Sequence, residues 1–136
     1  MESTQQHYVL GLPDMDEQHN HLYQVFSLLE DAPRVIDTNR TRRILEEIER
    51  YILFHFASEE LLMRRYGFPG FTEHEGDHGT IEGKLVEYLD SFEAGDLNPG
   101  RMRAFLSAWL DEHSRIADSV YAAWVIDKRR TIESGS

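Results

Sequence analysis

Histidine and acidic residues occur at helical spacing within residues 51–78. His55 and Glu59 are four residues apart, and so are His74 and His78, with a break containing Gly and Pro between the two pairs. A step of four residues returns a side chain to the same face of an α-helix, about one turn higher. Two neighbouring helices would therefore point three imidazoles and one carboxylate into a shared space, as in a metal site.

Three further residues extend this set of ligands. His19 and His113 fall on the apolar faces of two other expected helices, and Asp118 follows His113 by five residues. Five residues of α-helix turn by about 140°, so we expect Asp118 to approach the centre from the side. Of the neighbouring pair Glu59 and Glu60, we expect Glu60 to face solvent.

The number and type of these ligands suggest two metal ions. Buried imidazoles without partners cost about 1–3 kcal/mol for each unsatisfied group, and a shared metal centre removes that cost. The chain offers five inward-facing imidazoles and two carboxylates, which exceed what one ion accepts but suit two ions bridged by the carboxylates. Nitrogen and oxygen ligands without sulfur favour iron, with manganese or zinc as alternatives.

The composition is that of one globular domain. The chain has 136 residues, of which 40% are hydrophobic, and a net charge of −11. Such a charge offers no basic surface for nucleic acid or for an anionic membrane, and no apolar segment reaches the roughly 20 residues that span a bilayer. The absence of cysteine excludes disulfides and thiolate ligands. With no segment resembling a signal peptide, we expect a cytoplasmic protein.

Apolar residues recur at helical spacing in four segments, separated by short breaks rich in Gly, Pro and Asn. Their period is close to 3.6 residues, and no window alternates with a period of two. We therefore predict an all-α, antiparallel up-down-up-down four-helix bundle with the metal site in its core. We expect an N-terminal arm over residues 1–13, the bundle over 14–128 and a flexible tail over 129–136. The expected inward residues of the last helix are Met102, Phe105 or Leu106, Trp109, His113, Ile116 or Ala117, Val120 and Trp124.

Three glycines interrupt the third helical segment. Gly76, Gly79 and Gly83 lie in the helix that carries His74 and His78. Each costs about 1 kcal/mol relative to alanine in an exposed helix interior. Close approach of a neighbouring helix would explain them, and so would a site that tolerates a loosened helix.

Four short motifs give the chain a resemblance to a known family. They are residues 11–19 (GLPDMDEQH), 55–63 (HFASEELLM), 74–78 (HEGDH) and 109–118 (WLDEHSRIAD). In this order they are similar to the His, HxxxE, HxxxH and HxxxxD pattern of the hemerythrins, and of the bacterial hemerythrins in particular. The resemblance covers roughly residues 11–124, which is nearly the whole chain.

The resemblance implies a pair of iron ions, bridged by carboxylates and an oxo or hydroxo group, that binds O2 reversibly. The implied ligands of one iron are His74, His78 and His113, those of the other are His19 and His55, and the implied bridges are Glu59 and Asp118. The second iron would keep an open position for O2. The implied lining of the O2 pocket is Phe56, Trp109, Leu110 and Ser114. Storage or delivery of O2, rather than enzymatic catalysis, is the implied role.

Ser114 departs from the family pattern, which usually has a bulky apolar residue at this position. We expect its hydroxyl, or the room left by its small side chain, to admit water. Faster autoxidation than in a storage hemerythrin would follow, together with peroxide or NO chemistry. The arm also lacks the tryptophan that many bacterial members carry, with His7 and Tyr8 in that region.

Three other interpretations use the same residues. The same site would suit an O2- or redox-sensing module of a larger signalling protein, with a fused or separate output domain. HEGDH also matches the H-E-x-x-H motif of zinc metalloproteases, with Glu75 as the general base. That interpretation gives no role to His19, His55, Glu59, His113 and Asp118, and no strand is expected to line a peptide cleft. A metal-free helical interaction module would contain no iron.

Overall fold

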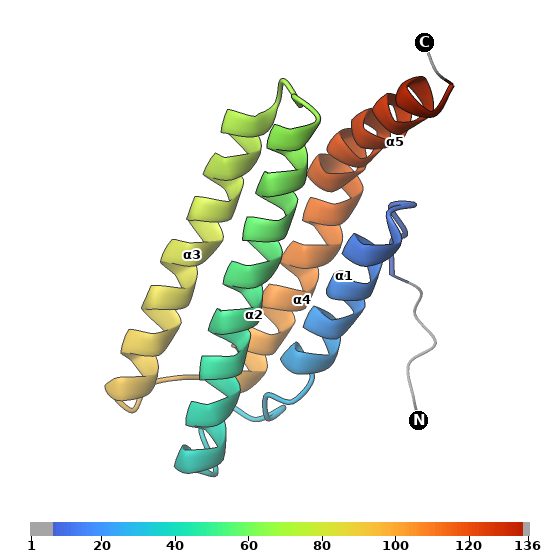
Figure 1. Ribbon diagram of the computed structural model, residues 1–136. Coiled ribbons are helices and arrows are strands. Elements are labelled where there is room, and N and C mark those ends of the chain that lie inside the picture. Colours follow the sequence, from blue (N-terminus) through green and yellow to red (C-terminus); the bar gives the residue numbers. More distant parts are fainter. Residues whose placement is uncertain (1–6, 135–136) are drawn as a thin grey trace.

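Four antiparallel rods of helix make up the protein in the computed structural model, which describes residues 7–134 (Figure 1). The elements are α1 (Pro13–Phe26), α2 (Thr38–Arg65), α3 (Phe71–Glu93), α4 (Pro99–His113), the π-helical turn η1 (Ser114–Asp118) and α5 (Ser119–Glu133). Figure 1 shows α4, η1 and α5 as one continuous rod, from orange to red. No strand occurs in the described part of the chain, so the predicted all-α four-helix bundle is confirmed.

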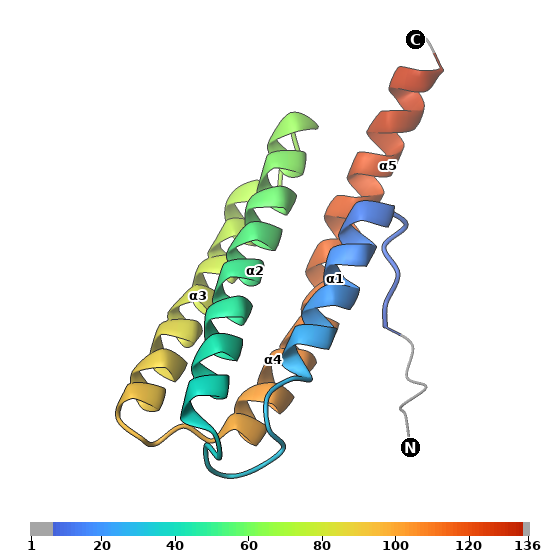
Figure 2. The same cartoon turned by 60° about the horizontal axis from the view of Figure 1, so that its bottom comes forward.

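The connections between the helices are short. Those joining α1 to α2 and α3 to α4 lie at one end of the bundle, and the α2–α3 connection lies at the other (Figure 2). Asp37 caps the start of α2 by accepting a hydrogen bond from the Arg40 backbone N–H at 3.0 Å. At the end of α2, Gly67 has φ +63°, and the Phe68 N–H donates to the Met63 carbonyl at 2.9 Å. This is the hydrogen bond of a Schellman motif, which stops α2 and turns the chain into α3.

Residues 7–12 of the expected arm pack against the bundle. Leu10 and Leu12 are buried, and the Asp16 carboxylate accepts hydrogen bonds from the backbone N–H groups of Leu10 at 2.7 Å and Gly11 at 3.1 Å. The His7 ring stacks on Tyr23 with a centroid distance of 3.5 Å. Residues 1–6 of the arm lie outside the described residues. The arm thus covers one side of α1 as far as it is described.

At the C-terminal end the structure differs from the expected boundary at residue 128. Helix α5 continues to Glu133, and the Arg129 Nε donates a hydrogen bond to the Tyr66 hydroxyl at 3.1 Å. Basic side chains in the last turn of a helix interact favourably with its dipole, which helps the helix continue. Residues 135 and 136 of the expected tail lie outside the described residues. None of the described helices is both long and apolar enough to cross a membrane.

Two apolar clusters form the core. The larger includes Leu22 and Ile52 and draws on α1–α4, and the smaller includes Met15, Met63 and Tyr121 from α1, α2 and α5. Along each rod the predicted metal ligands fall between residues of one cluster and residues of the other. The polar residues therefore occupy a layer with apolar packing on both sides.

The three glycines of α3 face open space. A Cβ atom added to Gly76, Gly79 or Gly83 would meet no atom within 4 Å, apart from the helix backbone and chain neighbours. Close approach of another helix therefore does not explain them. They lower the intrinsic stability of the helix that carries His74 and His78 without any visible packing gain.

Replacing these glycines by alanine should stabilise the protein. We expect Gly79→Ala and Gly83→Ala each to raise the free energy of unfolding by about 0.5–1 kcal/mol, because alanine loses less backbone entropy on folding. Gly67→Ala should instead lower it by about 1–2 kcal/mol, since its positive φ strains an L-residue. Urea denaturation measures all three, and a loss of stability in Gly79→Ala would contradict the open surroundings.

Candidate metal centre

All seven predicted ligands converge in the layer between the two apolar clusters. They come from α1, α2, α3, the end of α4 and the end of η1, and are His19, His55, Glu59, His74, His78, His113 and Asp118. None is more than 6% exposed, and the carboxylates Glu59 and Asp118 are both at 0%. The cluster is thus almost completely buried.

Glu59 lies between two groups of imidazoles. Its Oε2 faces the Nε2 atoms of His55 at 3.4 Å and His19 at 3.7 Å. Its Oε1 faces the Nε2 atoms of His78 at 3.0 Å and His74 at 3.7 Å. One carboxylate therefore presents a separate oxygen to each group.

Asp118 repeats this arrangement from the last rod. Its Oδ2 lies 3.3 Å from the His19 Nε2, whereas its Oδ1 lies 2.9 Å from the His74 Nε2 and 3.2 Å from the His113 Nε2. The seven residues thus form two positions that share both carboxylates. We call these the three-imidazole position (His74, His78 and His113) and the two-imidazole position (His19 and His55).

The π-helical turn η1 explains how Asp118 enters the centre. The Ser119 N–H bonds to the Ser114 carbonyl, five residues back in the chain. A π turn holds more residues than an α-helical turn, so residues five apart lie close to the same face rather than about 140° apart. Asp118 therefore shares the inner face with His113, and the α-helical geometry expected from the sequence is wrong at this point.

The same turn shifts the inner face of α5 by one residue. The expected inward residues Ile116 and Val120 are 65% and 58% exposed. The residues that are buried instead are Ser114, Asp118, Tyr121, Ala122 and Val125. A π turn adds one residue to a helical turn, so every later position moves to the next residue.

Three imidazoles have polar partners on the side away from the centre. The His55 Nδ1 lies 2.7 Å from the Gln18 Oε1, and the His78 Nδ1 lies 2.9 Å from a carboxylate oxygen of Glu60. The partner of the third is the Ser114 hydroxyl, 3.3 Å from the His19 Nδ1. Such partners fix the ring orientation and leave Nε2 directed at the metal site.

Sequence reasoning missed Glu60, Gln18 and Tyr121. Glu60 was expected at the surface, but only 21% of its side chain is exposed and it contacts His78. The buried Tyr121 hydroxyl donates a hydrogen bond to the Glu59 Oε2 at 3.0 Å. Burial, followed by the negative charge of Glu59, raises the pKa of Tyr121, which keeps this donor protonated. Gln18 had a signal in the sequence, because it directly precedes the expected ligand His19.

The four residues of the expected O2 pocket do not share one side of the centre. Phe56 stacks on His78 with a centroid distance of 3.8 Å, and Trp109 stacks on His113 at 4.6 Å. The fourth of them, Ser114, contacts the two-imidazole position, and Leu110 is buried in the larger apolar cluster. Ser114 is 1% exposed, which does not support the expected entry of water beside it.

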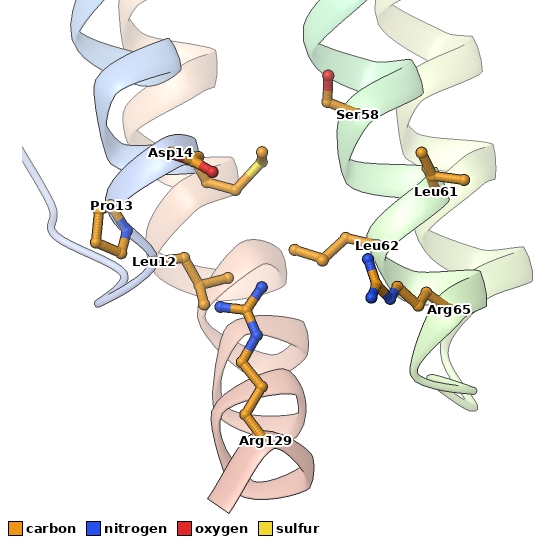
Figure 3. A pocket seen from close by; sticks show the side chains of 9 residues that line it. Leu12, Pro13, Asp14, Ser58, Leu61, Leu62, Arg65 and Arg129 are labelled. Carbon is orange, nitrogen blue, oxygen red and sulfur yellow. The ribbon is translucent and has the colours of Figure 1, made fainter. Parts of the chain in front are cut away.

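Hollows on the surface reach the two positions unequally. One of about 240 Å³ lies between the start of α1, the second half of α2 and α5, and is lined by Leu12, Pro13, Asp14, Met15, Ser58, Leu61, Leu62, Arg65 and Arg129 (Figure 3). None of the seven clustered residues lines it. Two others, of about 250 and 270 Å³, are lined by His113 and His74 respectively. Residues of the three-imidazole position therefore border two of the hollows described here.

Glu75 of the HEGDH motif lies outside the cluster. It is exposed, and its carboxylate is 3.8 Å from the Arg64 guanidinium. A general base of a zinc protease would have to lie beside the metal. The position of Glu75 therefore argues against the metalloprotease interpretation.

Five atoms of the cluster are buried without a hydrogen bond. They are the Nε2 atoms of His19 and His78, the Oε1 of Glu59 and both carboxylate oxygens of Asp118. Orphaned buried polar atoms are rare in proteins, and their direction towards common points suits bound cations. Ligand atoms within 4.8 Å of one another form two sets, one around each position, and both sets include Glu59 and Asp118. The residues fit two metal ions.

The carboxylates also control the protonation of the imidazoles. Burial lowers the pKa of His19 and of His74, but the close carboxylates of Asp118 and Glu59 outweigh burial and raise each pKa to about 9. Burial raises the pKa of Asp118, yet its contacts with His113, His19 and His74 lower it to about 2. Without a metal, cationic imidazoles balance the carboxylates, and a bound metal ion would replace these protons.

The fold and this cluster define an all-α bundle protein with a buried histidine–carboxylate cation site. Residues 10–125 match the family model of the hemerythrin HHE cation binding domain. The chain belongs to the hemerythrin family.

Several known proteins are similar to this chain. The bacteriohemerythrin of Stenotrophomonas maltophilia is 30% identical over 113 residues, which cover 83% of this chain and 74% of that protein. The bacteriohemerythrin of Pseudomonas paraeruginosa is 32% identical over 111 residues, 82% of this chain and 72% of that protein. A crystal structure of wild-type hemerythrin superposes with a TM-score of 0.81 at 23% identity, covering 92% of this chain and 97% of that one.

Metal removal should make stability depend on pH above neutrality. A pKa raised from 6.5 to about 9 in the folded protein stabilises it fully below pH 6.5, and this contribution is lost as the pH rises through about 9. We expect the free energy of unfolding of chelator-treated protein to fall over this range. Urea denaturation at several pH values measures it, and His19→Gln should show a smaller decrease. A flat profile would contradict the ion pairing.

The two glutamates Glu59 and Glu75 should differ in their effect on metal content. Glu59→Gln removes a shared carboxylate charge from the buried centre, so we expect purified protein to lose most of its bound metal. Glu75→Gln makes the same change on the exposed side of α3, and this variant should retain its bound metal. Elemental analysis measures both, with circular dichroism to verify folding. Equal metal content in the two variants would refute the role of Glu59.

Proposed function

We propose that this protein holds two iron ions in the candidate metal centre and binds O2 reversibly. The observation that carries the proposal is that the two oxygens of each buried carboxylate face different metal positions. Glu59 and Asp118 each direct one oxygen to the three-imidazole position and the other to the two-imidazole position. This is the arrangement that two bridging carboxylates require, and imidazole with carboxylate suits iron.

The number of protein ligands supports an open position at one metal. The three-imidazole position offers three nitrogens and two carboxylate oxygens, whereas the two-imidazole position offers two nitrogens and two oxygens. The position with fewer protein ligands would retain room for O2. The iron pair, when bound, would supply the electrons and the coordination site for O2.

The surrounding residues would protect such chemistry. Apolar clusters on both sides and the aromatic rings of Phe56 and Trp109 limit the water that reaches the layer. The hydrogen bonds of His19 and His55 to neutral partners hold those rings in place. The similarity to proteins named bacteriohemerythrin gives independent support.

Sensing of O2 or redox state is the second candidate. Asp118 ends η1, and α5 continues from it as a straight rod beyond the rest of the bundle (Figure 1). A change in the position of Asp118 would therefore act directly on the first turn of α5. Delivery and sensing use the same centre and differ in how long the oxygenated form persists.

Metal analysis combined with visible spectroscopy tests the proposal. Protein loaded anaerobically with ferrous iron should contain two irons per chain and gain visible absorption bands in air. Those bands should disappear when O2 is removed, whereas metal-free protein should show no change. Retention of zinc alone would overturn the proposal of an iron centre. Absorption bands that never disappear on removal of O2 would overturn the proposal of reversible O2 binding. A form lasting many minutes favours delivery, and one lasting seconds favours sensing.

A further inference from the structure

The outer partners of the imidazoles differ in charge between the two metal positions. In the two-imidazole position, His55 contacts the amide oxygen of Gln18 and His19 contacts the hydroxyl of Ser114, and both partners are neutral. In the three-imidazole position, His78 contacts the carboxylate of Glu60 at 2.9 Å. Only the second of these positions receives a negative charge through its outer contacts, among the contacts described.

This difference changes how strongly each imidazole binds a cation. A carboxylate that accepts the Nδ1–H makes the hydrogen bond charge-assisted and raises the basicity of Nε2. A neutral amide or hydroxyl oxygen orients the ring but adds no charge. His78 should therefore be a stronger ligand than His55 or His19.

Tyr121 acts in the same direction from the other side of the centre. Its hydroxyl donates to the Glu59 Oε2, the oxygen that faces the two-imidazole position, at 3.0 Å. The Glu59 Oε1, which faces His78, makes no hydrogen bond. A hydrogen bond withdraws electron density from its acceptor, so Oε2 is the weaker ligand of the two oxygens.

We propose that Glu60, Gln18 and Tyr121 are positioning residues that give the two metal positions unequal strength. Glu60 strengthens the three-imidazole position, so that it fills first, while Gln18 and Tyr121 keep the two-imidazole position weaker and slower to fill. This inference rests on the proposed function only in requiring two metal ions. The number of ligands also favours the three-imidazole position, so variants of the outer partners must separate the two causes.

Stepwise binding of cobalt(II) tests the proposal without iron or O2. Metal-free protein is titrated with Co2+ in competition with a chelator, and the visible absorption of bound cobalt reports each step. Glu60→Gln should lower the affinity of the first step by about 10–100-fold and change the second less than about threefold. Glu46→Gln makes the same charge change on an exposed part of α2 and should leave both steps unchanged.

Two variants should act on the second step alone. Gln18→Glu supplies His55 with a carboxylate partner and should tighten the second step by about tenfold or more, and Tyr121→Phe should tighten it by a smaller factor. A loss of folding would weaken both steps, so it cannot imitate these gains. Equal effects on both steps, or none from Glu60→Gln, would overturn the inference and leave the two-metal proposal intact. Failure to bind a second cobalt ion would instead count against both.

Discussion

The burial of two carboxylates is the constraint on which the rest of the structure depends. Glu59 and Asp118 are fully buried, and an ionised carboxylate in an apolar core is costly unless it is paired. Five imidazoles, at least one from each of the four rods, pair with the two carboxylates. The contacts of Asp118 with His113, His19 and His74 lower its pKa to about 2. The helices must therefore converge at one level, and the apolar clusters above and below this level hold them there.

A local departure from α-helical geometry makes this convergence possible. His113 and Asp118 are five residues apart, so a regular α-helix could not direct both at the centre. The π turn η1 aligns them and brings Ser114 into contact with His19. It leaves Ile116 and Val120 exposed on the surface and places Tyr121 beside Glu59. One added residue in a turn thus sets both the centre and the packing of α5.

Regular spacing in the sequence predicted the bundle, the five clustered histidines and Glu59, whereas Asp118 was expected to approach the centre only from the side. The pairs His55–Glu59 and His74–His78 each lie within one α-helix, where a step of four residues returns to the same face. The inner face of α5 was not predicted, because Ile116 and Val120 continue the α-helical period in the sequence, whereas the π turn moves the buried positions on by one residue. The contact of Glu60 with His78 joins α2 to α3 and depends on the relative rotation of those helices. No pattern within one helix encodes that rotation.

The two metal positions share Glu59 and Asp118 but take their other residues from partly different helices. The hairpin of α2 and α3 supplies Glu59, Glu60, His74 and His78, which all serve the three-imidazole position. The two-imidazole position combines His19 of α1 with His55 of α2, and its outer contact from Ser114 comes through η1. A bulky apolar residue at 114 would provide packing there but no partner for the His19 Nδ1. Ser114 thus orients the His19 ring but provides no apolar lining at the two-imidazole position, which is the position proposed to bind O2.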